Sequence, residues 1–204
     1  MESIGKNLDL VMSKIKSIGI IAEDLSDIEA SKLLIKRIIQ KDRMPFKHYT
    51  GDGCGKIMRK ALDWSNLLHQ RGCDLLVLIH DLDRNHLLKL KGDLQAVLKS
   101  SKMQNKLICI PTEEMEAWFL SDMDGLRTAM SLKRTPKAFT NPENVPSPKE
   151  KLGEIVYLCS NKERSYLNTK HNSKLALSLS IDLMKTKCPS FNELHQYLTA
   201  QTYK

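Results

Sequence analysis

The sequence predicts an α/β fold in which helices flank a mostly parallel sheet, with a helical extension at the C-terminal end. Three observations support this prediction. Short apolar segments alternate with amphipathic segments over the first two thirds of the chain, and strands that alternate with helices imply parallel pairing through right-handed crossovers. Residues 73–85, CDLLVLIHDLDRN, contain a continuous apolar run that is typical of a strand covered on both faces. Residues 150–204 show only helical patterns.

The first half of the predicted sheet begins with a strand at residues 17–24, SIGIIAED, which ends in two acids. A helix is expected over residues 26–41, where Ser26 and Glu29 form an S-x-x-E capping box and large apolar residues recur at helical spacing. Two further elements complete this half: a brief strand at residues 45–50 and a helix at about residues 56–70.

The second half contains the clearest strand of the chain, within residues 73–85, and a helix is expected at about residues 85–99. Residues 106–111, KLICIP, form another apolar run and predict a buried strand. The next helix is expected to begin with Thr112 as its N-cap, because threonine is a favoured capping residue.

The chain changes character after these elements. Residues 131–151 hold four prolines and few large apolar residues, which indicates a linker or an irregular excursion. We therefore expect an α/β core at residues 1–123. In residues 124–204, the proline-rich excursion and the helical extension are expected to pack on that core.

The composition argues against several classes of protein. No apolar run approaches the ~20 residues that span a bilayer, and the first residues, MESIGKNLDLVMSKIK, lack the apolar stretch of a signal peptide. We therefore expect a cytoplasmic protein with no membrane partner. The five cysteines are scattered and show no C-x-x-C spacing, which argues against a disulfide framework and a structural zinc site.

The charge balance indicates an anionic partner. The formal net charge is +8 among 204 residues, and excess positive charge attracts polyanions over long distances. Nucleic acid, either DNA or RNA, is the natural candidate. The alternative is a basic protein that binds no nucleic acid.

Carboxylates follow two of the predicted strands. Glu23 follows the first strand, and Asp81 and Asp83 follow the strand within residues 73–85. Residues i and i+2 of an extended chain point to the same side, so Asp81 and Asp83 are expected to aim at one point that Glu23 can also reach. Clustered carboxylates repel one another, and a hard divalent cation such as Mg²⁺ or Mn²⁺ relieves that repulsion. These residues predict a metal site.

Other polar residues near the strand ends have a simpler explanation. Three of them are assigned to helix caps: Asp24, Asp27 and Asn85. A further acidic group, Glu113, Glu114 and Glu116, lies in the first turn of a predicted helix, where the helix dipole alone favours acids. Because this turn also lies at the carboxyl edge of the sheet, one of the three is expected to complete the metal site. Glu116 is our choice.

The glycine-rich stretch GDGCGKIMRK, residues 51–60, raises the question of phosphate binding. It is not a P-loop, because the spacing between the glycines is one residue too short and Ile57 stands where Ser or Thr would bind Mg²⁺. The helix that follows offers free N–H groups and Lys56, which together suit a nucleic-acid phosphate. A flexible turn between strand and helix is the alternative.

The acidic strand ends resemble those of the TOPRIM domain, a Rossmann-like domain of topoisomerases, primases and OLD-family nucleases, over residues 17–120. The chain resembles more closely a group of small bacterial TOPRIM-like proteins classed as a domain of unknown function. The matching segments are IIAEDLSD, GDGCGK, LLVLIHDLDRN, EEMEAWFLSD, PKEKL, TKHNSKLA and CPSFNEL. One departure is Asp24, which stands where the first TOPRIM strand commonly ends in Glu-Gly.

The resemblance implies a metal-dependent nuclease with Glu23 as the essential glutamate and with Asp81 and Asp83 as metal ligands. It also implies a site role for His171, with Lys170 beside it, and Lys149 is expected to line a substrate groove. Relatives of this kind often accompany an ATPase partner, some serve phage defence, and TOPRIM sheet edges often pair, so a homodimer is expected.

Two other functions stay open at this stage. One is a non-catalytic TOPRIM-like module for nucleic-acid binding or assembly. The other, less well supported, is a receiver-like or phosphatase-like protein that uses the acids for phosphoryl chemistry. Trp64 and Trp118 lie on helical faces and are expected in the core, because stacking platforms use exposed aromatic residues in a basic groove.

Overall fold

A computed structural model describes residues 15–51 and 54–202 and confirms the α/β fold class. All four strands of its sheet run parallel, in the order β2-β1-β3-β4. This arrangement is Rossmann-like and places β1 and β3 in the middle, side by side. The strand bounds are β1 Ile18–Ala22, β2 Phe46–Thr50, β3 Leu75–Ile79 and β4 Asn105–Cys109.

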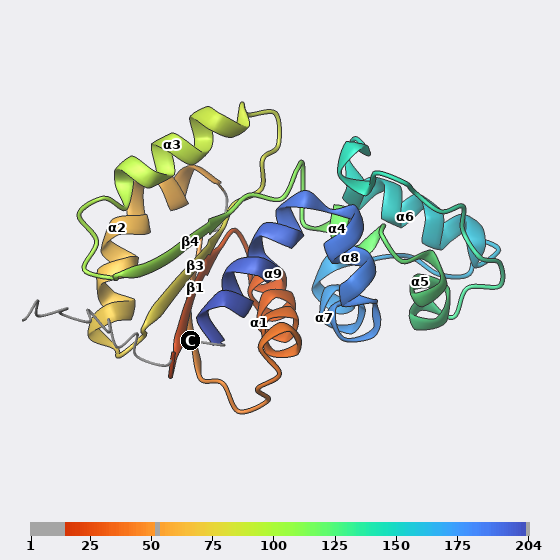
Figure 1. Ribbon diagram of the computed structural model, residues 1–204. Helices are drawn as coiled ribbons and strands as arrows, with labels where there is room; N and C mark the ends of the chain where they lie inside the picture. Colours follow the sequence, from red (N-terminus) through yellow and green to blue (C-terminus); the bar gives the residue numbers. More distant parts are fainter. Residues whose placement is uncertain (1–14, 52–53, 203–204) are drawn as a thin grey trace, which may run out of the picture.

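Helices cover both faces of the sheet, as the continuous apolar runs of β1 and β3 require. Ile18 and Ile20 face a core shared with α1, Leu25–Ile39, and α9, Pro189–Thr202. Ile21, one residue further along β1, faces the opposite core. That second core is closed by two helices, α2 Cys54–Gln70 and α3 Leu87–Val97. Figure 1 shows α2 and α3 on one side of the sheet and α1 and α9 on the other.

The C-terminal region is helical, as expected. Helix α7 packs along α1, and α9 returns to the sheet beside β4 (Figure 1). The remaining bounds are α4 Glu116–Phe119, α5 Met123–Met130, a 3₁₀ turn Pro142–Asn144, α6 Pro148–Cys159, α7 Asn168–Ser178 and α8 Ile181–Lys187. The excursion predicted at residues 131–151 is therefore shorter in the structure, because Pro148 already occupies the first turn of α6, a position that suits proline.

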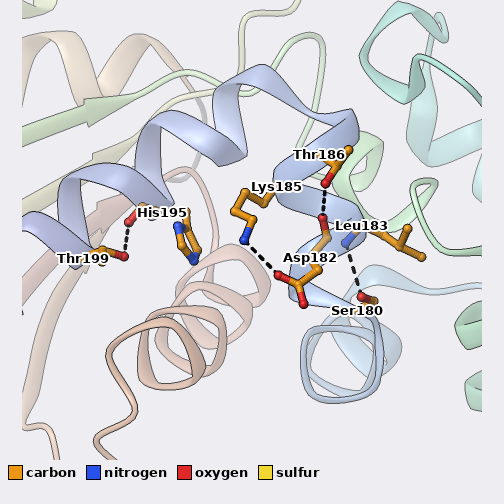
Figure 2. A network of polar contacts seen from close by, with 7 residues as sticks. All are labelled: Ser180, Asp182, Leu183, Lys185, Thr186, His195 and Thr199. Atoms are coloured by element: carbon orange, nitrogen blue, oxygen red, sulfur yellow. Dashed lines mark hydrogen bonds and ion pairs between the residues drawn. The ribbon is translucent and has the colours of Figure 1, made fainter.

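Helices α8 and α9 follow each other closely, and local side-chain contacts fix each of them (Figure 2). The hydroxyl of Ser180 accepts a hydrogen bond from the Leu183 N–H at 3.2 Å and so caps α8. The Lys185 ammonium contacts the Asp182 carboxylate at 2.9 Å, one turn away on the same helix. These contacts set the start of α8 before the chain turns into α9.

Three predicted helix starts are wrong. Asn85 does not cap α3, because His86 is the N-cap residue and the Asn85 side-chain amide donates to the Leu82 carbonyl at 3.0 Å. Helix α1 is capped by Asp24 and Asp27, whose side chains accept hydrogen bonds from each other's backbone N–H, so the capping box is not Ser26 with Glu29. The Glu29 carboxylate instead contacts Lys32 at 2.6 Å on the same helix. Thr112 is not an N-cap, because Glu113 adopts a left-handed conformation with φ of 62° and α4 begins only at Glu116.

No helix within the described ranges is long and apolar enough to cross a membrane. The four cysteines whose side chains the structure describes, Cys73, Cys109, Cys159 and Cys188, carry free thiols.

Candidate metal centre

The carboxyl ends of the two central strands bring Glu23 and Asp81 together. Residues Ile21 and Leu78 are paired in the parallel register of β1 and β3, so the residues that follow the two strands leave the sheet side by side. The backbone N–H of Asp81 donates a hydrogen bond to the Glu23 carboxylate. This edge of the sheet is where parallel α/β proteins place their ligands.

The Glu23 carboxylate is partly buried and incompletely paired. Its Oε1 atom is shielded from solvent and has no hydrogen-bond partner. The ring of His80, which is itself buried, lies beside it, with its Nδ1 atom 3.4 Å from Oε1. Burial raises the pKa of Glu23, and the negative charges of Asp83 and Asp24 add to this, while His80 and the Asp81 N–H act against it.

Asp81 lies at the centre of the cluster. Burial is the main reason that its pKa lies well above the usual value for an aspartate. Four other carboxylates contribute by repulsion: Asp27, Glu23, Glu116 and Glu114. Each repulsion operates only over a short distance in a partly buried site, so these side chains share one electrostatic environment.

Asp27 belongs to the same cluster, although its sequence position indicated only a helix cap. It is buried, and its position in the first turn of α1 directs its side chain back toward the strand end that α1 follows. Burial raises its pKa to about 8, with repulsion from Asp24, Glu116 and Glu23 as further causes. Its spacing from Glu23 across the turn that starts α1 is compatible with a place in the cluster, but an ordinary helix cap shows the same spacing.

Glu116 is buried in the cluster and is held by two polar side chains. Its Oε1 atom lies 2.8 Å from the Tyr166 hydroxyl and accepts a hydrogen bond from the Asn172 side-chain amide at 3.2 Å. Tyr166 also forms a hydrogen bond with Asn172. Helix α7 therefore reaches into the site. The structure places Glu116 beside the acids at the strand ends, where it was expected.

Asp83 lies at the rim of the site. The predicted alternation of Asp81 and Asp83 does not hold, because β3 ends at Ile79 and Asp83 adopts a left-handed conformation with φ of 47°. Asp83 is exposed, but its charge still raises the pKa of Glu23. It borders a polar pocket of about 450 Å³ that is lined by Asp83, Arg84, Asn85, Glu113, Glu114, Ser147 and Glu150.

Three of the expected basic site residues lie in the first turns of α6 and α7: Lys149 in α6, and Lys170 and His171 in α7. The backbone N–H of Lys149 donates to the Glu114 carboxylate at 2.9 Å, which ties the start of α6 to the acidic edge. Lys170 is exposed in the first turn of α7. The ring of His171, in the same turn, accepts a hydrogen bond through Nδ1 from the Leu167 N–H at 2.9 Å. Burial and the neighbouring lysines lower the pKa of His171.

Lys56 lies elsewhere, in the first turn of α2, with its ammonium 6.0 Å from the ring centre of Trp64. Part of the expected phosphate loop before it, Asp52 and Gly53, lies outside the described residues. The structure therefore places Lys56 beside an aromatic ring.

The donors of the cluster suit a hard cation. Within residues 15–51 and 54–202, no three His, Cys, Asp or Glu side chains already meet the geometry of a metal site. The chemistry nevertheless fits Mg²⁺ or Mn²⁺, because buried carboxylates raise one another's pKa and one oxygen, Glu23 Oε1, has no hydrogen-bond donor. A divalent cation would satisfy that oxygen and remove the repulsion.

Fold and site together define a Rossmann-like α/β protein with a buried carboxylate cluster at the carboxyl edge of its parallel sheet. Residues 21–199 match the family described as "Domain of unknown function (DUF4276)", and the chain belongs to this family. No curated protein and no solved structure matches the chain.

Proposed function

We propose that this protein is a metal-dependent nuclease of the TOPRIM-like type that hydrolyses phosphodiester bonds with Mg²⁺ or Mn²⁺. The observation that carries the proposal is the cluster of Glu23, Asp27 and Asp81. At the carboxyl edge of the sheet, Asp27 is buried and Glu23 and Asp81 are partly buried, burial raises the pKa of each, and Glu23 Oε1 has no hydrogen-bond donor. A site with this much uncompensated negative charge favours a cation.

Glu23, Asp27 and Asp81 would hold the cation, with Asp83 at the solvent side. When bound, Mg²⁺ supplies Lewis-acid stabilisation of the phosphate charge and lowers the pKa of a coordinated water. Glu116 is held away from solvent by Tyr166 and Asn172, and its role is to maintain the negative potential at Asp27 and Asp81.

The chain also offers groups for proton transfer and substrate binding. A carboxylate with a raised pKa is suited to general acid–base catalysis near neutral pH, and Glu23 is the candidate because it is partly exposed and has a raised pKa. His171 accepts a hydrogen bond at Nδ1, so its Nε2 atom carries the proton when the ring is neutral and is available as a donor. Lys149 and Lys170 supply positive charge for the nucleic-acid backbone.

A cleavage assay with the Glu23→Gln variant tests the proposal. Purified protein is incubated with plasmid DNA, single-stranded DNA and total tRNA in Mg²⁺, Mn²⁺ or EDTA. We expect cleavage that requires metal and falls about 10³-fold or more in Glu23→Gln, because removing one central group of a metal-assisted site costs several kcal/mol of transition-state stabilisation. The matched control is Glu29→Gln, which neutralises a carboxylate on α1 that contacts Lys32 at the surface.

The outcomes separate catalysis from binding. Cleavage that is retained in Glu23→Gln contradicts the proposed site. Nucleic acid that binds but is not cleaved in either metal supports the alternative, a non-catalytic TOPRIM-like module for binding or assembly. An ATPase partner and a homodimer remain part of the proposal, and the same assay with partner protein added addresses the first of them.

A further inference from the structure

Two aromatic rings stack against each other near the edge of the sheet that β2 forms. The ring centres of Tyr49, from β2, and Trp64, from α2, are 5.5 Å apart and their planes differ by only 2°. Both side chains are partly exposed and rest on the core beneath α2. The prediction that Trp64 is a core residue is therefore only half right, because part of it reaches the surface.

A positively charged side chain lies over each of the two rings. The Lys56 ammonium lies 6.0 Å from the centre of the Trp64 ring, and the Arg71 guanidinium lies 6.0 Å from the centre of the Tyr49 ring. Cations at this distance from an aromatic ring are attracted to its face. Partly exposed aromatic rings beside cations are the combination with which proteins bind single-stranded nucleic acid, since bases stack on the rings and phosphates contact the cations.

The second tryptophan, Trp118, is a structural aromatic residue whose surroundings differ from those of Trp64. Trp118 is fully buried, packs edge-on against Phe191 with ring centres 5.2 Å apart, and donates its indole N–H to the Ser190 hydroxyl at 2.8 Å. Trp118 is thus enclosed on the opposite face of the sheet. Trp64 instead stacks in parallel with Tyr49 beside Lys56 and Arg71.

The stacked pair lies close to the acidic cluster. Tyr49 is paired with Ile21 in the register of β2 and β1, and Glu23 follows two residues after Ile21. Two residues along a strand and one strand across correspond to a backbone separation of about 8 Å. A single strand that stacks one base on these rings therefore needs only a few nucleotides to reach Glu23.

We propose that Tyr49 and Trp64, together with Lys56 and Arg71, form a stacking subsite for an unpaired base, so that single-stranded nucleic acid is the substrate class. The base takes the place of the Lys56 or Arg71 side chain over the outer face of a ring, and the displaced cation moves to a neighbouring phosphate. This inference rests on the proposed nuclease function, because it assigns the subsite to the strand that enters the acidic site. A duplex presents no unpaired base face to the rings, so it binds this subsite less tightly.

Tryptophan fluorescence measures the stacking directly, because the chain has two tryptophans and Trp118 is enclosed in the core. The full chain is titrated in EDTA with a single-stranded oligonucleotide of 12 thymidines, so that no cleavage occurs, and with a 12-base-pair duplex of mixed sequence. We expect the single strand to quench the fluorescence and the duplex to quench it much less. The Trp64→Phe variant, which leaves only Trp118, is expected to show no quenching.

Variants at Tyr49 test the site itself through the anisotropy of a labelled oligonucleotide. Tyr49→Leu is expected to weaken single-strand binding about tenfold, because stacking on one aromatic residue is worth ~1–3 kcal/mol per base. Tyr49→Phe keeps the ring and is expected to keep the affinity, which separates stacking from misfolding. The matched control is Tyr157→Leu, which removes an exposed aromatic ring from α6.

These outcomes test the stacking subsite separately from the proposed nuclease activity. Unchanged binding in Tyr49→Leu, or equal quenching by single strand and duplex, overturns the stacking subsite even when Glu23-dependent cleavage is observed. Quenching that is lost in Tyr49→Leu and kept in Tyr49→Phe supports the subsite even when Glu23→Gln still cleaves, in which case only the proposed catalytic site fails.

Discussion

At the scale of single residues, the main feature is negative charge held out of water. Glu23, Asp27 and Asp81 all have raised pKa values, and burial is the first cause for each. Burial without a compensating cation disfavours the charged form of a carboxyl group. The metal-free protein therefore carries a stability cost at this site that depends on pH.

Asp27 allows that cost to be measured. Its pKa is about 8 in the folded protein against 3.8 for an unperturbed aspartate. A raised folded-state pKa means that the carboxyl group stabilises the fold below pH ~4, and that this contribution is lost as the pH rises through 8. We expect Asp27→Asn to remove this loss, so that in EDTA at pH 8 the variant is more stable than the wild type by about 2–5 kcal/mol.

Urea unfolding in EDTA between pH 4 and pH 9 checks this prediction. Asparagine keeps the oxygen that accepts from the Asp24 N–H, so the helix cap is retained. Adding Mg²⁺ at pH 8 is expected to raise the melting temperature of the wild type and to raise that of Asp27→Asn much less. If the free energy of unfolding changes with pH in the same way in both proteins, the pKa of Asp27 is not raised by burial, and the prediction is contradicted.

The sequence identified part of this site but not all of it. Glu23 and Asp81 could be predicted because they directly follow apolar strands, and strand ends in a parallel sheet share an edge. Asp27 could not be distinguished from an ordinary cap, since it does accept the cap hydrogen bond. The direction of Asp83 depends on a left-handed backbone beyond the end of β3, which no alternating pattern predicts.

At the scale of elements, the central strand β1 and helix α2 approach each other closely. Gly19 lies within β1, and a Cβ atom at this position would lie 2.9 Å from Leu68 Cδ1 and 3.2 Å from Leu68 Cβ. The first contact can be relieved by rotating the leucine side chain, but the second requires α2 to shift. A residue larger than glycine therefore disturbs the packing of α2 on the sheet.

A pair of glycine-to-alanine substitutions tests this contact. We expect Gly19→Ala to lower the free energy of unfolding by about 1–2 kcal/mol through overpacking. The matched control is Gly92→Ala in α3, where no heavy atom lies within 4 Å of the added Cβ. Because alanine favours the helix over glycine, that variant is expected to gain about 0.5–1 kcal/mol. Urea denaturation of both variants measures the difference, and a stabilised Gly19→Ala would contradict the close approach.

Element types were largely predictable, while their pairing was not. The apolar runs indicated the strands β1, β3 and β4 because a strand covered on both faces excludes polar residues. The order β2-β1-β3-β4 depends on contacts between distant segments, which local patterns do not encode. The start of α4 was misplaced because the left-handed Glu113 separates it from Thr112.

At the scale of the whole molecule, one buried cluster joins the sheet to the C-terminal helices. Ile20 of β1 and Val77 of β3 share this cluster with Leu175 of α7 and Phe191 of α9. The opposite face of the same strands carries the second cluster beneath α2 and α3. Loss of the C-terminal helices would expose the part of this face that α1 does not cover, so neither the sheet nor the C-terminal helices are expected to unfold alone.

The Trp64→Phe variant tests this continuity, because its only tryptophan, Trp118, reports on the cluster that joins the sheet and α9. We expect its urea unfolding transition, followed by fluorescence, to coincide with the transition followed by far-ultraviolet circular dichroism, which reports on the helices of both faces. A two-state protein gives one midpoint by every probe. If the helical signal instead shows a second transition, the region after residue 123 unfolds as a separate unit. The acidic site would then be assembled between two units, since Tyr166 and Asn172 hold Glu116 from beyond that boundary.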